Sequence, residues 1–125
     1  MKPIVTSVEE LYGRREATGE VLLDEMANCL RRTRIIAVAD LATLMDVDAH
    51  QLNQAVRLLT GMTTRDVINR WRLLQAQELL RQGATGEAKE ERIRRLNAAA
   101  RRCGWRSYRV LLKVAHRYGV KLETL

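Results

Sequence analysis

Apolar residues recur at three- and four-residue spacing along most of the chain, which is the period of an amphipathic α-helix. A first short helix is expected from Val8 to about Ala17, opened by a capping box of Ser7 and Glu10. A second helix is expected over residues 20–32. The stripe in that second segment consists of Val21, Leu22, Glu25, Met26, Cys29 and Leu30. Most of these side chains are apolar and are predicted to face one core.

Two further helices separated by a tight turn are predicted between residues 38 and 60. The first covers 38–45, and its inward side chains are expected to be Leu41, Ala42 and Met45. Asp46 and Val47 form the turn, and Asp48 is an N-cap candidate for a helix over 49–60. The inward side chains of this helix are expected to be Leu52, Val56 and Leu59. Gly61 is expected to end it in the left-handed conformation.

A long central helix and a second helix pair complete the pattern. The central helix is predicted over residues 64–82, capped by Thr63 or Thr64, with about 18 residues and a length of roughly 27 Å. A polar loop with two glycines is expected at 83–91. The next apolar stripe consists of Ile93, Leu96, Ala99 and Ala100. That helix is expected to end at Cys103 and Gly104, and Ser107 is expected to open a last helix that runs to Tyr118.

The doubled pattern predicts an all-α fold, with two helix-turn-helix units joined by a long linker helix and a short extra N-terminal helix. The predicted segments are an N-terminal extension (1–19), a first unit (20–63), the linker helix (64–82), a loop (83–91) and a second unit (92–125). A weak internal repeat supports the doubling, because LATLMDVDAHQL is echoed by AAARRCGWRSYRVLL.

Composition excludes several classes of protein. The 125 residues contain no Phe and one Pro, which favours helix over an aromatic-rich β fold. Cys29 and Cys103 form no CxxC pair, so neither a zinc site nor a disulfide framework is expected. No apolar segment is long enough for a signal peptide or a membrane span, and we expect a cytoplasmic, nucleoid-associated protein. His50 and His116 lack neighbouring ligands or catalytic partners, so no enzyme activity, metal, cofactor or small-molecule ligand is expected.

Positive charge is concentrated near the C-terminus. The chain has a net charge of +7. Residues 92–122 hold ten basic side chains and no acidic one, whereas the rest of the chain holds 12 basic and 15 acidic side chains. A solvated basic face is the alternative interpretation, but this asymmetry favours a polyanionic partner for the C-terminal part.

The polar side chains of the segment 49–60 suit the recognition of DNA bases. With the apolar stripe facing inward, the outer residues are His50, Gln51, Asn53, Gln54 and Arg57. Asn and Gln amides can donate to and accept from adenine at once, while Arg57 is better placed for a phosphate.

In the second unit, the corresponding residues are Arg106, Ser107, Tyr108, Arg109, Lys113 and Arg117. Arg106 or Arg109 could bind guanine, and Lys113 and Arg117 suit phosphates. The alternatives are an ordinary solvated face in the first unit and purely electrostatic binding in the second.

The two tracts LATLMDVDAHQLNQAVRLLTGMTTRDVINRWRLLQAQELL and RLNAAARRCGWRSYRVLLKVAHRYGVKLETL resemble the DNA-binding domain of AraC/XylS-family transcription regulators. The second tract contains the A-x-x-x-G-[FW] turn of that family, at 100–105, and the resemblance covers roughly residues 20–125. It implies a bacterial, seven-helix regulator that binds double-stranded DNA through one helix of each unit in successive major grooves, with RNA polymerase as a candidate second partner. The family's DNA-contacting positions match His50, Asn53 and Gln54 in the first unit, and Ser107, Tyr108, Arg109 and Lys113 in the second.

The chain departs from the family pattern at three places. Asp46 stands where the family usually has Gly, and Asp tolerates the left-handed conformation at modest cost. The loop at 83–91 is longer and more charged than usual. The second unit is one residue shorter, and Ala115 replaces a bulky aromatic residue. Residues 1–19 leave room for one short helix only, so we expect either a stand-alone DNA-binding protein or a fragment of a longer regulator.

Two interpretations follow from the sequence. The first is a sequence-specific DNA-binding regulator, in which Trp71 of the linker helix belongs to the core. The second is a helical protein-interaction module that keeps the fold and binds an acidic protein partner.

Overall fold

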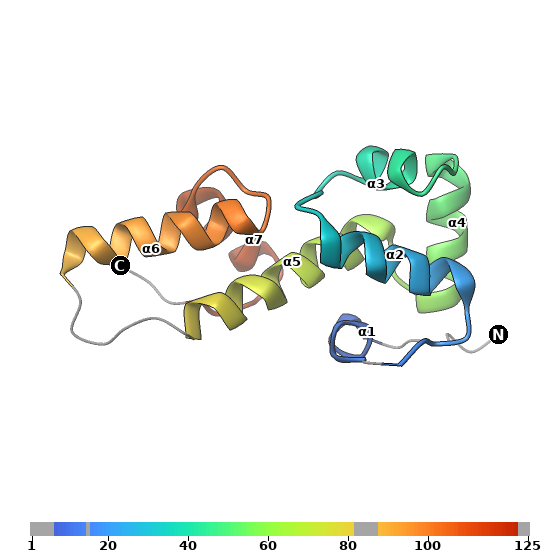
Figure 1. Cartoon of the computed structure of the whole chain (residues 1–125), viewed down its shortest axis with the longest axis horizontal. Helices are drawn as coiled ribbons and strands as arrows, with labels where there is room; N and C mark the ends of the chain where they lie inside the picture. Colours follow the sequence, from blue (N-terminus) through green and yellow to red (C-terminus); the bar gives the residue numbers. More distant parts are fainter. Residues whose placement is uncertain (1–6, 15, 82–87, 123–125) are drawn as a thin grey trace. The chain divides into compact units, whose positions relative to one another are not determined.

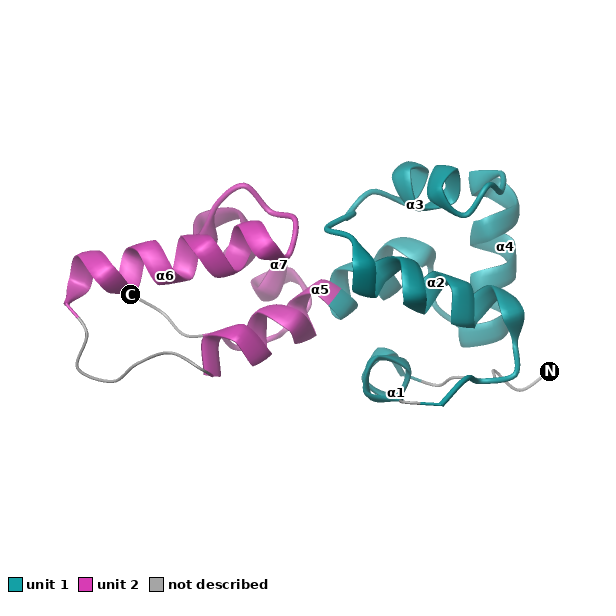
Figure 2. Ribbon diagram, viewed as in Figure 1, with its two compact units in different colours: residues 1–71 teal, residues 72–125 magenta. Residues whose placement is uncertain are grey.

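The computed structural model describes residues 7–14, 16–81 and 88–122, and every regular element in these ranges is an α-helix. The helices are α1 (Val8–Gly13), α2 (Val21–Arg32), α3 (Val38–Leu44), α4 (Ala49–Thr60), α5 (Thr64–Arg81), α6 (Lys89–Arg102) and α7 (Tyr108–Arg117) (Figure 1). The predicted all-α class is therefore confirmed. The chain divides into two compact units, residues 1–71 and 72–125, and the division falls inside α5 (Figure 2).

Trp71 lies in the core of the first unit. Its side chain is fully buried, which confirms its predicted core position. The ring of Tyr12 in α1 meets the ring of Trp71 edge-on, with 5.0 Å between the centroids and an interplanar angle of 81°. The guanidinium carbon of Arg31 in α2 lies 5.3 Å from the centroid of the Trp71 ring. Aromatic pairing and cation–π attraction both add to the stabilisation that comes from burying this large side chain. Trp71 therefore links α1, α2 and α5.

Helix α1 is shorter than predicted, because it ends at Gly13 and not near Ala17. The chain turns to an extended conformation at Arg14, whose guanidinium donates to the carbonyl oxygens of Glu16 and Ala17, at 3.4 Å each. Val8 and Leu11 are nevertheless buried. Helix α1 is thus part of the core of the first unit.

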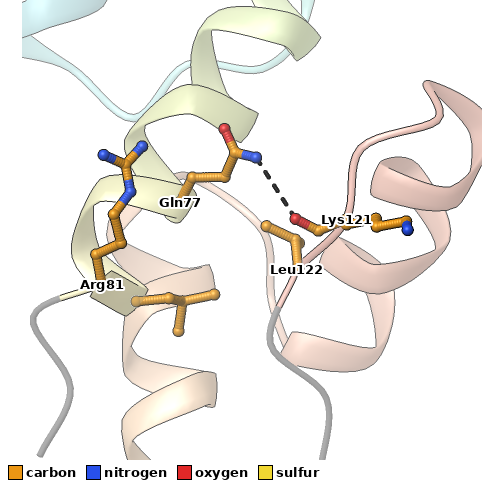
Figure 3. Close-up of a pocket in the computed structure, with 5 residues that line it drawn as sticks. Gln77, Arg81, Lys121 and Leu122 are labelled. Carbon is orange, nitrogen blue, oxygen red and sulfur yellow. Dashed lines mark hydrogen bonds between the residues drawn. The ribbon is translucent and has the colours of Figure 1, made fainter.

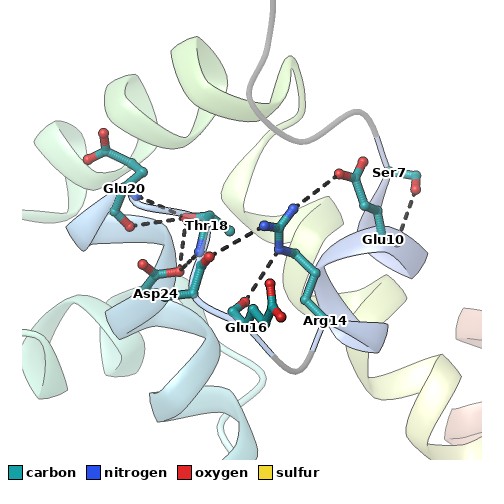
Figure 4. Close-up of polar contacts among 8 residues, drawn as sticks. Ser7, Glu10, Arg14, Glu16, Thr18, Glu20 and Asp24 are labelled. Atoms are coloured by element: carbon teal, nitrogen blue, oxygen red, sulfur yellow. Dashed lines mark hydrogen bonds and ion pairs between the residues drawn. The ribbon is translucent and has the colours of Figure 1, made fainter.

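The segment after α1 is attached to α2 through Asp24 (Figure 4). The backbone N–H of Thr18 donates to Asp24 Oδ1 at 2.8 Å, and the Thr18 hydroxyl donates to the same oxygen at 2.9 Å. Chiefly because of the bond from the Thr18 N–H, the pKa of the Asp24 carboxyl lies below its usual value of 3.8. A carboxyl with a lowered pKa stabilises the folded state above its unfolded pKa, and this contribution is lost as the pH falls through the folded pKa.

We therefore expect Asp24→Asn to be less stable than the wild type at neutral pH, because the charged acceptor is lost. The difference between the two proteins should shrink at strongly acidic pH, where the wild-type carboxyl is itself protonated. Urea unfolding of both proteins over a series of pH values measures this. A difference that stays constant down to strongly acidic pH would show that the charge of Asp24 is not the stabilising feature.

The buried face of α2 differs in part from the predicted stripe. Met26, Cys29 and Leu30 are buried as expected, but Val21 is 77% exposed. The core side also includes Leu23 and Ala27. Val21 precedes Leu23 by two positions, or about 200° of helical rotation, so it points away from the buried stripe. The placement of Val21 in the core was wrong.

The end of α3 forms the predicted tight turn. The N–H of Val47 donates to the carbonyl of Ala42 at 3.0 Å, and the N–H of Asp46 donates to that of Thr43 at 3.1 Å. These are the two bonds of a Schellman motif, with Met45 as the C-cap. Asp46 has a φ of 55°, which confirms that aspartate takes the left-handed conformation in this turn.

A β-branched residue at position 46 is expected to destabilise the first unit. Asp46→Val should cost about 1–2 kcal/mol, because its branched side chain clashes in the left-handed conformation. Asp46→Gly serves as the matched variant and should be tolerated, since glycine adopts a positive φ without strain. Thermal unfolding of the three proteins checks this. Equal stability of the valine and glycine variants would contradict the importance of this turn conformation.

The end of α6 repeats the same pattern of hydrogen bonds in the second unit. The N–H of Trp105 donates to the carbonyl of Ala100 at 3.0 Å, and the N–H of Gly104 donates to that of Arg101 at 3.1 Å. Gly104 has a φ of 97° and follows Cys103, the C-cap of α6. The predicted end of this helix at Cys103 and Gly104 is confirmed, and the weak sequence repeat corresponds to a repeated turn.

Helix α6 begins earlier than predicted. Residues 89–91, which were expected in a loop, form its first turn, while residues 83–87 of that loop lie outside the described residues. Glu90 and Glu91 stand in this first turn, where carboxylates are favoured by the helix dipole. The polar composition that suggested a loop therefore also suits a helix start.

Arg72 lies in the core of the second unit, and its burial was not predicted from the sequence. It is fully buried, and its Nη1 donates to Gln75 Oε1 at 2.8 Å. Burial lowers the pKa of Arg72 to about 10. Burial also raises the pKa of the Cys103 thiol to about 11. At neutral pH the arginine is therefore charged, and Cys103 is a neutral core thiol and no nucleophile.

Candidate nucleic-acid interface

Helix α4 is fixed at both ends by the residues that the sequence indicated. Asp48 Oδ2 accepts the backbone N–H of Gln51 at 3.2 Å, so Asp48 is the N-cap. Gly61 closes the helix with a φ of 74° and donates its N–H to the carbonyl of Arg57 at 2.8 Å. The buried side chains are Leu52, Val56 and Thr60. Leu59, which was expected to face inward, is only half-buried.

The outer side of α4 presents all the side chains that were predicted there. The exposed residues are His50, Gln51, Asn53, Gln54, Arg57 and Leu58. Spacings of three and four place His50, Asn53, Gln54 and Arg57 on one stripe, with Gln51 at its flank. Helix α4 contains no acidic side chain. This stripe therefore offers two amides, an imidazole and a guanidinium to a partner that is rich in hydrogen-bonding groups and negative charge.

Helix α7 is positioned by two side-chain caps. Ser107 Oγ accepts the backbone N–H of Val110 at 3.4 Å, which makes Ser107 the N-cap as predicted. Asn97, in the middle of α6, accepts the backbone N–H of Tyr108 through Oδ1 at 2.9 Å. The Nδ2 of Asn97 donates to the carbonyl of Ile93 at 3.1 Å. Both the oxygen and the nitrogen of the amide are thus hydrogen-bonded, and Asn97 ties the start of α7 to α6.

Loss of the Asn97 side chain is expected to weaken this attachment. Asn97→Ala should destabilise the second unit by about 1–3 kcal/mol, because it leaves the first N–H of α7 without its acceptor. Asn97→Asp is the matched variant and should lose less, since a carboxylate at a helix N-terminus still accepts this N–H. Hydrogen exchange of the Tyr108 amide, together with urea unfolding, measures both. Equal protection in the wild type and Asn97→Ala would contradict this role.

The exposed side of α7 is cationic, but it differs from the prediction at Tyr108. Arg109, Lys113 and Arg117 are exposed, as is Arg106 in the preceding turn. Tyr108 is only 5% exposed. It lies on the same stripe as the buried residues Leu111 and Ala115, on the side that packs against α6. The prediction that Tyr108 is exposed for base contact was therefore wrong, and Ser107 is half-buried with its hydroxyl engaged as a cap.

The two exposed stripes correspond position by position when α4 and α7 are aligned on their N-caps, Asp48 and Ser107. The matching pairs are His50 with Arg109, Asn53 with Leu112, Gln54 with Lys113, and Arg57 with His116. The two amides of the α4 stripe, Asn53 and Gln54, are thus replaced by a leucine and a lysine in α7. The second stripe is consequently richer in charge and poorer in groups that distinguish one base from another.

Three exposed arginines of α6 were not assigned to a site from the sequence. Arg94, Arg101 and Arg102 are exposed on α6. In the sequence, only their position within the basic segment 92–122 suggested that they could bind a polyanion. Leu112 was also missed, although it is 36% exposed between the cations of α7. The sequence could have indicated it, because Leu112 is an apolar residue at three- and four-residue spacing from the polar residues Arg109 and His116 of α7.

No described helix is long and apolar enough to cross a membrane. Within the described ranges, no three His, Cys, Asp or Glu side chains lie close enough together to hold a metal ion. No family model, no curated protein and no solved structure matches this chain.

Proposed function

We propose that this protein is a sequence-specific double-stranded DNA-binding transcription regulator of the AraC type, which inserts α4 and α7 into major grooves of the duplex. The observation that carries the proposal is the outer stripe of α4. Two amides stand there on a capped helix that contains no acidic residue and follows a tight turn from α3. This arrangement suits a helix-turn-helix unit, in which the second helix contacts base edges.

The stripe on α4 provides the base contacts in this proposal. Asn53 and Gln54 lie in the first half of the helix, where recognition helices approach the bases. Either amide can bind N6 and N7 of adenine together, and His50 lies one turn before Gln54. Arg57, in the second half of α4, contacts a phosphate and sets the register of the helix on the duplex.

The stripe on α7 provides mainly electrostatic affinity. Arg106 and Arg109 stand at the start of the helix and can bind guanine through O6 and N7. Lys113 and Arg117 neutralise phosphates, with release of counterions. Because α7 lacks the amides of α4 and Tyr108 is buried, the first unit contributes most of the sequence preference. The second unit contributes much of the affinity.

Selection from a library of randomised duplexes, in the presence of excess bulk DNA, tests this function. We expect the wild type to enrich one motif, and we expect that motif to contain an adenine whose importance depends on Asn53 or Gln54. Asn53→Ala and Gln54→Ala are the informative variants, and Leu58→Ala, an exposed residue at the flank of the same helix, is the control. Enrichment of no motif above bulk DNA would refute sequence-specific recognition.

A further inference from the structure

An apolar groove with a cationic rim lies beside α7 and the residues that follow it. The DNA-binding proposal uses only two of its cations, Arg109 and Lys113, and makes no use of its apolar lining. The groove has a volume of about 750 Å³. Its apolar lining comes from Leu112, Val120 and Leu122. The charged or polar side chains around these residues are Arg109, Lys113, His116 and Lys121. All of these residues belong to the second unit.

The wall formed by residues 119–122 is held in place by two hydrogen bonds. The N–H of Val120 donates to the carbonyl of Ala115 at 2.9 Å, as part of the turn that ends α7 at Gly119. The Nε2 of Gln77 in α5 donates to the carbonyl of Lys121 at 3.4 Å (Figure 3). The groove is therefore formed before any ligand binds, which lowers the entropic cost of docking.

The charge of the groove selects an acidic occupant. Three cationic side chains stand on its rim, and no carboxylate is among the residues that line it. A second copy of this chain, with its net charge of +7, is a poor candidate. Duplex DNA is acidic, but the apolar groups that it presents in the major groove are thymine methyls, which are small for a groove of this volume. Apolar side chains flanked by carboxylates match both the lining and the rim.

We propose that this groove is a docking site for an acidic amphipathic helix of a partner protein. A helix satisfies its own backbone hydrogen bonds, whereas an extended peptide needs a strand to pair with, and the described part of the chain has none. One or two leucine-like side chains of the partner enter between Leu112 and Val120. Carboxylates beside them meet Arg109, Lys113 and Lys121. Because Arg109 and Lys113 are shared with the DNA-binding proposal, the partner helix and the duplex exclude each other on α7.

The first test uses a synthetic acidic peptide of about 15 residues, long enough for partial helix formation, with leucines at four-residue spacing and glutamates beside them. A control peptide has the same charge, with glutamine in place of each leucine. Fluorescence anisotropy should show binding of the leucine peptide and roughly tenfold weaker binding of the control. Backbone amide NMR shifts should map the leucine peptide to α7 and residues 120–122. Absence of binding, or equal binding of the two peptides, would overturn the proposal.

The second test separates apolar docking from charge attraction. Leu112→Arg adds a cation but removes the apolar contact, so it should weaken binding of the leucine peptide about tenfold. The matched control is Leu58→Arg, which makes the same change at a leucine of α4 that is 56% exposed, and it should leave binding unchanged. Circular dichroism verifies that both variants fold. Equal or tighter binding by Leu112→Arg would show that the peptide binds through charge alone and would overturn the proposal.

The third test adds duplex DNA to the complex with the leucine peptide. DNA is expected to release the peptide, because both ligands use Arg109 and Lys113. Simultaneous binding of both ligands would place the peptide elsewhere and would contradict the assignment. A protein that bound the peptide in the groove but bound no duplex would refute the proposed function and would support the docking site.

Discussion

Replacement of Trp71 by alanine is expected to destabilise the first unit by about 3–5 kcal/mol, which is the usual cost of truncating a large buried aromatic side chain. Trp71 is fully buried, and it contacts the ring of Tyr12 and the guanidinium of Arg31. Truncation removes the transfer free energy of the ring, leaves a cavity and abolishes both of these contacts. Most single domains are stable by only 5–15 kcal/mol, so the variant should lose much of its stability. Urea unfolding followed by circular dichroism measures the change.

Two matched variants identify the cause of this loss. Trp71→Phe keeps an aromatic ring beside Tyr12 and should therefore lose clearly less stability than the alanine variant. Val21→Ala removes an apolar side chain that is 77% exposed, and it should change the free energy of unfolding by less than about 0.5 kcal/mol. If Trp71→Ala were no less stable than Val21→Ala, the assignment of Trp71 to the core would be wrong.

Asn53→Ala is expected to weaken binding to the preferred duplex by about 1–3 kcal/mol, with the loss confined to one base pair. The physical reason is the loss of a bidentate contact to adenine, which a methyl group cannot replace. Changing that base pair should reduce the affinity of the wild type but should have little further effect on the variant. Fluorescence anisotropy with the two proteins and the two duplexes gives all four affinities. If the losses of affinity from Asn53→Ala and from the base-pair change simply added, Asn53 would not contact that base pair.

Arg117→Ala is the contrasting variant, because Arg117 is expected to contact a phosphate. It should weaken binding to all sequences alike and reduce the slope of log affinity against log salt by about 1. Its side chain is exposed on α7, so folding should be unaffected. If Asn53→Ala and Arg117→Ala had the same effect on sequence preference and salt dependence, the division between base and phosphate contacts would be wrong.

The sequence predicted the ends of most helices well, because those ends depend on local chemistry. Asp48 and Ser107 accept the backbone N–H three residues ahead, as N-caps do. Gly61 and Gly104 take left-handed conformations that other residues avoid. Even the aspartate at position 46 was correctly expected in such a conformation. Each of these features involves residues a few positions apart, so it can be inferred without knowledge of tertiary contacts.

Burial was harder to predict where it depends on contacts between distant segments. Tyr108 is a polar aromatic residue at the start of a helix, and only its packing toward α6 shows that it is buried. Arg72 is buried although arginine is among the residues least often found inside proteins. Helix α1 joins the core through Tyr12 and Trp71, which are far apart in the sequence. The polar stripe of α4 was predicted correctly, because the periodicity of a single helix defines it.

The most direct test of the central claim is the ratio of two dissociation constants. These are measured by anisotropy at physiological salt for the duplex selected by this protein and for a shuffled duplex of the same composition. Specific DNA-binding proteins prefer their sites by a factor of about 10³ or more, and we expect a ratio of that order for the wild type. A ratio close to one, with binding to both duplexes that depends on salt alone, would contradict sequence-specific recognition by α4.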